Sequence, residues 1–150
     1  ESTPLQIADP YALSKFTDEA TAAMMWWRHG LSVCSLRFPY LGEADTTLRS
    51  RAQRLHDDPS LGVSELWAYL DLRDAARACL AGAQREPNGT DVVVVAAPQT
   101  LVSYSTESLL DKYAPDVPRR RRFVENEVPL DLRHAKAVLN FEAQYLWSAA

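Results

Sequence analysis

Residues 31–38 are the part of this sequence that most restricts its fold. The run is short and apolar, it follows a clearly bounded helical pattern, and Pro39, Tyr40, Leu41 and Gly42 break it and begin a more polar stretch. A strand that is apolar along its whole length is typical of a parallel sheet covered on both faces. The sequence therefore predicts an α/β fold with residues 31–38 as a parallel strand.

The preceding segment, from Asp9 or Pro10 to about Arg28, predicts a long helix. A proline near the first turn and Gly30 just past the last are typical helix boundaries. Apolar residues recur along it at three- and four-residue intervals, and they must be buried against the sheet or against a second subunit. This stripe consists of Phe16, Ala20, Ala23, Met24 and Trp27.

Helical and strand patterns alternate along the rest of the chain. We expect helices at 46–56, 75–84 and 105–113, strands at 66–70 and 92–96, and a turn at Asn88 and Gly89. Asp74 is expected to cap or open the second of these helices. Cys34 and Cys79 fall in a predicted strand and a predicted helix, where buried, reduced thiols are expected.

Tyr11 and Lys15 stand four residues apart near the start of the predicted helix. Residues at that spacing share one helix face, so the phenol and the ammonium would point into the same space. A cation beside a phenol favours the phenolate, which lets the hydroxyl donate or accept a proton nearer neutral pH. A hydride-transfer enzyme needs such a group beside a carbinol or ketone. Two half-exposed surface residues are the alternative interpretation.

Five stretches of the sequence support the catalytic interpretation. They are PYALSK at 10–15 with Glu19 after it, GLSVCSLRF at 30–38, WAYLDLRDAARA at 67–78, VVVVAAP at 92–98 and DLRHAKAVLNFE at 131–142. In this order they resemble the catalytic helix, the next strand, a strand with its helix, a later strand and the closing helix of one family. It is the extended short-chain dehydrogenase/reductase family, which includes the NAD-dependent sugar epimerases and dehydratases.

The resemblance implies the C-terminal portion of a Rossmann-type doubly wound parallel sheet plus a small α/β substrate-binding domain. Residues 1–42 would end the dinucleotide-binding domain, and 43–150 would form mainly the substrate-binding domain, with 66–97 returning to the main sheet. It also implies NAD or NADP as cofactor. Tyr11 and Lys15 would be the catalytic pair and would bind the cofactor, which Phe38 and Pro39 would also contact.

The same resemblance points to a small-molecule substrate, with a nucleotide sugar as the candidate. Phe38 to Gly42 lie where ligands bind, beyond the carboxyl end of a parallel strand. Tyr40 stands where many relatives have an asparagine that contacts the sugar nucleotide, so this sequence departs from the family there. Arg119 and Arg120, from a run of four arginines, are candidates for the diphosphate. A solvated loop is the alternative for this run.

The family's glycine-rich phosphate turn is absent from this sequence. The five glycines, at 30, 42, 62, 82 and 89, are not spaced for it. Ser2 and Thr3 lie too close to Tyr11 to be the family's catalytic serine or threonine. We therefore expect the C-terminal part of a longer enzyme, inactive alone and a homodimer when complete. A non-catalytic substrate-binding or interaction module is the alternative.

Composition argues against several other functions. The formal net charge of -4 gives no general attraction to nucleic acid or to an anionic membrane, and no apolar stretch is long enough to span a bilayer. The three histidines, at 29, 56 and 134, have no carboxylate or cysteine at ligand spacing, so no metal site is expected. We expect a cytoplasmic protein.

Overall fold

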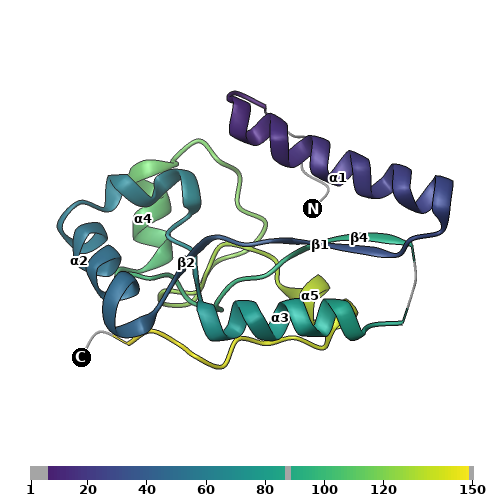
Figure 1. The fold of residues 1–150 in the computed structure, drawn as a ribbon. Helices are drawn as coiled ribbons and strands as arrows, with labels where there is room; N and C mark the ends of the chain where they lie inside the picture. Colours follow the sequence, from purple (N-terminus) through teal and green to yellow (C-terminus); the bar gives the residue numbers. More distant parts are fainter. Residues whose placement is uncertain (1–6, 87–88, 149–150) are drawn as a thin grey trace.

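A computed structural model describes residues 7–86 and 89–148 (Figure 1). Helices and strands alternate along the chain, as the sequence predicts. In order they are α1 (Pro10–His29), β1 (Val33–Arg37), β2 (Tyr40–Gly42), the π-helical turn η1 (Ala44–Leu48), α2 (Arg49–Asp57), the 3₁₀ helix η2 (Pro59–Glu65), β3 (Tyr69–Asp71), α3 (Leu72–Gln84), β4 (Thr90–Val94), α4 (Thr106–Tyr113) and α5 (Arg133–Leu139). Ser2, Thr3 and Asn88 lie outside the described residues.

The strands form two parallel pairs, which the chain following β4 connects. β1 pairs with β4, and β2 pairs with β3. Beyond β4, the backbone N–H of Val95 donates to the carbonyl of Arg37 at 3.0 Å, and that of Ala97 donates to the carbonyl of Tyr69 at 2.9 Å. The same segment therefore contacts both pairs. The predicted parallel α/β arrangement is confirmed.

Helices cover both faces of the β1–β4 pair. Figure 1 shows α1 on one side of these strands and α3 with α5 on the other. On the α1 side, Trp26 lies beside Gly89, 3.7 Å from the position that a Cβ would take there. On the other side, Cys34 of β1 packs against Gly82 of α3. Helices on both faces of parallel strands are the arrangement of doubly wound α/β folds.

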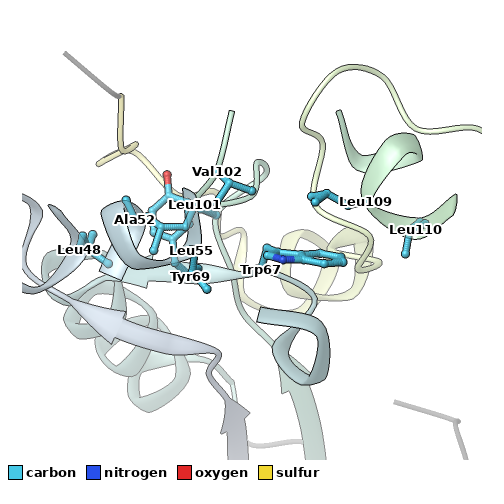
Figure 2. Packing of buried hydrophobic residues seen from close by; sticks show 10 residues of the cluster. Leu48, Ala52, Leu55, Trp67, Tyr69, Leu101, Val102, Leu109 and Leu110 are labelled. Atoms are coloured by element: carbon cyan, nitrogen blue, oxygen red, sulfur yellow. The ribbon is translucent and has the colours of Figure 1, made fainter. Parts of the chain in front are cut away.

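Two apolar clusters form the core. The first lies between α2, β3 and α4 and contains the buried side chains of Trp67 and Tyr69 (Figure 2). The second lies between the strands and helices α3 and α5. Three residues of α2 and the turn before it, Leu48, Ala52 and Leu55, belong to the first cluster and form the apolar stripe of that helix.

The strand predicted at 66–70 begins later than expected. Leu66 and Trp67 have φ angles of +54° and +53°, which strand residues do not adopt. Leu66 is the left-handed C-cap of η2. Trp67, which follows it, is 1% exposed, and its Nε1 donates to the carbonyl of Pro59 at 2.7 Å. The strand therefore starts at Tyr69, two residues after the buried Trp67.

Two further predictions of local structure are wrong. Residues 40–42 do not end the sheet, because they form β2 and pair with β3, so that only Phe38 and Pro39 separate β1 from β2. Asp74 does not cap α3. The N-cap is Asp71, whose carboxylate accepts from the backbone N–H of Arg73 at 2.9 Å, while Asp74 is buried within the first turn.

Candidate functional site

The start of α1 is fixed by local interactions that position Tyr11 and Lys15. Asp9 is the N-cap, and its Oδ1 accepts from the backbone N–H of Ala12 at 2.8 Å. Pro10 occupies the first turn, where no helical hydrogen bond is lost, and Gly30 ends the helix in the left-handed conformation. These boundaries are the ones that the sequence predicts, and they place the two residues in the first two turns.

Tyr11 and Lys15 lie on the same side of α1. The Nζ of Lys15 is 5.8 Å from the centre of the Tyr11 ring, within the range of a cation–π contact. The Tyr11 side chain is not part of the core, since the residue is 74% exposed. The phenol is therefore open to a ligand and has a cation beside it.

Asp18 also holds the Lys15 ammonium. Its carboxylate accepts a hydrogen bond from Nζ at 2.9 Å, and both side chains are largely exposed. This hydrogen bond, together with the negative charge of Asp18, raises the pKa of Lys15 above its ordinary value. Lys15 therefore stays protonated, and an exposed ion pair of this kind exchanges easily with other partners.

An ion pair between Glu19 and Arg37 connects α1 to the end of β1. The Nε and Nη2 of Arg37 donate to the two carboxylate oxygens of Glu19 at 2.8 and 2.7 Å. Glu19 follows Lys15 by one helical turn, so the same region of α1 that carries the pair is fixed to the carboxyl end of β1. The hydrogen bonds from Arg37 lower the pKa of Glu19. The sequence does not predict this contact, because Glu19 and Arg37 belong to separate elements.

Phe38 and Pro39 form the junction between β1 and β2, both half-buried. Phe38 packs against the second apolar cluster. Ligands of open α/β sheets bind outside the carboxyl ends of the strands, and this junction lies at such an end. Phe38 and Pro39 therefore form a half-buried, partly apolar junction at this end of the strand.

Tyr40 is a half-buried residue of β2 and packs against the first cluster. The guanidinium of Arg51, from α2, lies 5.2 Å from the centre of its ring. Arg51 in turn donates to Glu65 at 2.9 Å. Part of the Tyr40 ring is therefore occupied by an internal contact.

Two of the four arginines in the run form internal ion pairs. Arg119 contacts Glu107 at 2.8 Å and Asp111 at 2.7 Å, and the hydrogen bond to Asp111 is the main cause of its raised pKa. Arg121 contacts Glu127 at 2.6 Å, while Arg120 is exposed. The charges of Arg119 and Arg121 thus fasten the chain beyond α4 to nearby carboxylates. The sequence could not show this, because the partners are separated from the run.

The described residues form neither a metal-binding cluster nor a membrane-spanning helix. Within residues 7–86 and 89–148, no three side chains of histidine, cysteine, aspartate or glutamate gather in a way that could hold a metal ion. No helix in these same ranges combines the length and the apolar character needed to cross a membrane.

The chain resembles several solved structures. MoeE5 in complex with UDP-glucuronic acid and NAD is 18% identical with a TM-score of 0.59, over 97% of this chain and 54% of that one. UDP-N-acetylglucosamine 4-epimerase from Bacillus cereus is 16% identical, with a TM-score of 0.54 and coverage of 91% and 48%. RMD from Pseudomonas aeruginosa, complexed with NADPH, is 17% identical with a TM-score of 0.54 and coverage of 91% and 51%. The chain shares their α/β fold.

These structures are about twice as long as the matched region, so the chain spans about half of their length. At these identities the likeness concerns the fold, which is the partial Rossmann-like fold that the sequence predicts. No protein-family model and no curated protein matches the sequence.

Proposed function

We propose that this chain is part of an NAD(P)-dependent epimerase, dehydratase or reductase that acts on a sugar or nucleotide sugar. Tyr11 is its general acid and base, and Lys15 is the cation that supports it. The single observation that carries this proposal is the 5.8 Å approach of Lys15 Nζ to the exposed Tyr11 ring. The shared fold with structures that hold NAD or NADPH supports it as well.

In this proposal Tyr11, Lys15, Phe38 and Pro39 hold one end of a nicotinamide dinucleotide. Tyr11 and Lys15 are exposed, and Phe38 and Pro39 lie at the carboxyl end of β1. When bound, the nicotinamide gives or takes a hydride. The sequence offers no glycine-rich turn for the pyrophosphate, so in this proposal a segment outside the 150 residues provides it.

The chemistry assigned to this chain is a proton transfer at the Tyr11 hydroxyl. The Oη would receive the proton of a substrate hydroxyl, or return it, while the neighbouring ammonium stabilises the phenolate. Lys15 would also hydrogen-bond the ribose hydroxyls of the nicotinamide. For both tasks it must leave Asp18, and the exposure of that ion pair makes the exchange easy.

The proposed substrate class is a small carbohydrate, with nucleotide sugars first. MoeE5 has been solved with UDP-glucuronic acid and with UDP-glucose. In this chain Tyr40, Arg119 and Arg120 are the proposed substrate residues. Arg120 is the most available of the three, because Arg119 already contacts two carboxylates and the Tyr40 ring lies beside Arg51.

We also propose that the complete protein is a cytoplasmic homodimer that uses α1. No residue of this helix is buried, and Leu13, Phe16, Met24 and Trp27 are 51%, 42%, 46% and 85% exposed. The predicted apolar stripe thus faces away from the sheet, apart from the half-buried Ala23. Replacement of Trp27 by lysine should yield a monomer in analytical ultracentrifugation if α1 forms the interface.

The alternative is a non-catalytic substrate-binding or interaction module. The open apolar stripe of α1 favours this alternative, because such a stripe suits a protein partner as well as a second subunit. A module of this kind would bind its ligand or partner without consuming NAD(P)H.

The test uses the full-length gene product with Tyr11→Phe. Removing the hydroxyl should lower turnover by about 10² to 10⁴-fold while leaving cofactor affinity nearly unchanged. Tyr104→Phe is the matched control, since that hydroxyl donates to the carbonyl of His56 at 3.1 Å, on another part of the surface. Unchanged turnover in Tyr11→Phe would overturn the catalytic assignment. A wild-type protein that binds a sugar but neither binds nor turns over NAD(P)H would support the module instead.

A further inference from the structure

The two cysteines of the chain, Cys34 and Cys79, line one cleft. Cys34 belongs to β1 and Cys79 to α3, and both are free thiols. Leu36, Phe38, Gly82 and Arg85 are among the other residues that line this cleft. Residues distant in the sequence thus bring both of its thiols to the same opening.

Gly82 explains how the strand and the helix come so close. A Cβ at Gly82 would lie 3.6 Å from the Cβ of Cys34 and 3.5 Å from its sulfur. Cys79 precedes Gly82 by three residues, so its side chain occupies the neighbouring position on the same face of α3. Both cysteines therefore line the cleft from neighbouring positions, one on β1 and one on α3.

The two thiols differ in exposure. Cys34 is half-buried, and burial is the main cause of its raised pKa, which the charge of Arg85 partly offsets. Cys79 is exposed, which corrects the prediction that both thiols are buried. A low-molecular-weight reagent therefore reaches Cys79 first, and Cys34 is in place to react second.

We propose that Cys34 and Cys79 are a redox-responsive pair that forms a reversible disulfide between β1 and α3. The oxidant is a low-molecular-weight disulfide such as oxidised glutathione. The Cys79 thiolate attacks one of its sulfurs, forms a mixed disulfide and releases one small thiol. The Cys34 thiolate then attacks the Cys79 sulfur and releases the second small thiol. The protein loses two electrons and two protons, and the small disulfide is reduced to two thiols.

Such a crosslink would act on the candidate site through β1. Cys34 is part of the strand that leads into Phe38, and Phe38 lines the same cleft as the two thiols. A bond between Cys34 and Cys79 would hold this strand against α3, which should raise the thermal midpoint of unfolding.

The experiment is a titration of the whole chain with oxidised glutathione, followed by intact-mass measurement and a count of free thiols. We expect both thiols to be lost, a mass decrease of about 2 Da, and a crosslinked peptide that contains both cysteines after digestion. Cys34→Ser and Cys79→Ser should each stop at a single glutathione adduct, and the adduct should form faster at Cys79 than at Cys34.

A designed variant provides the positive control. Gly82→Cys combined with Cys79→Ser places a Cβ 3.6 Å from that of Cys34, inside the separation of about 3.5 to 4.5 Å found in disulfides. This variant should lose about 2 Da under the same conditions. The proposal is overturned if the control variant forms its disulfide and the natural pair does not. The natural pair would then keep two glutathione adducts, remain fully reduced, or form disulfides only between molecules.

Discussion

The buried carboxylate of Asp74 accepts a hydrogen bond from the backbone N–H of Tyr145 at 2.8 Å, which fastens the end of the described chain to the first turn of α3. The same oxygen accepts from the N–H of Gln144 at 2.9 Å, and the other accepts from Arg77 at 2.5 Å. Asp74 is 0% exposed, so water cannot replace these contacts. A carboxylate in the middle of the sequence thereby determines the course of a segment far along the chain.

Asp74→Ala should destabilise the protein by about 3 kcal/mol, because it leaves two backbone N–H groups and a guanidinium without their acceptor. Asp74→Asn should cost less, since one oxygen remains to accept. Urea unfolding measures both, with Asp116→Asn on the exposed chain after α4 as the control. Equal stability of Asp74→Ala and the control would mean that the contact does not hold the segment.

Glu19→Gln should weaken the attachment of α1 by about 1 kcal/mol at neutral pH, because the half-buried bidentate pair with Arg37 loses its charge. Arg37 lowers the pKa of Glu19 below its ordinary value of 4.5. The stability from this pair is therefore complete above that value and is lost as the pH falls through the lower, folded-state pKa. The stability difference between wild type and Glu19→Gln should shrink on acidification in urea titrations. A difference that is constant with pH would contradict the assignment.

Gly62→Ala should destabilise the protein by about 1 to 3 kcal/mol through overpacking. The added Cβ would lie 2.4 Å from Cδ1 of Trp67, whose indole is held in the core by its bond to Pro59. Gly30→Ala is the comparison, since its Cβ would meet nothing within 4 Å and only its φ of +67° opposes the change. That cost should be about 1 kcal/mol. Chemical denaturation measures the loss of stability in each variant. Equal losses in Gly62→Ala and Gly30→Ala would argue against a tight Trp67 pocket.

Signals that act within a few residues were sufficient to predict much of this fold. Asp9 and Gly30 fixed the bounds of α1, and short apolar runs located β1 and β4 to within two or three residues. Features that depend on distant partners were not predictable. The burial of Trp67 and its hydrogen bond to Pro59 depend on the surrounding core, which the local sequence does not reveal.

The same distinction between local signals and contacts with distant partners applies to the candidate site. The spacing of Tyr11 and Lys15 was enough to place them on one face of a helix. The carboxylates that hold Arg119, and the bond from Glu19 to the end of β1, depend on how separate elements pack. Hydrogen-bond partners from other elements therefore had to come from the structure.

Lys15 and Asp18 provide the sharpest test of the proposed chemistry, because they separate the charge of the lysine from its present partner. Asp18→Asn should lower the raised pKa of Lys15 toward its ordinary 10.5, measured by NMR on the lysine side chain. In the full-length protein this change should leave turnover within a few-fold, since it removes only a competing acceptor. In the proposed mechanism Lys15→Met should lower turnover by about 10² or more, because it removes the cation proposed to support Tyr11. If Lys15→Met and Asp18→Asn have the same effect on turnover, the lysine serves only a surface ion pair. The proposed catalytic pair of Tyr11 and Lys15 would then be wrong.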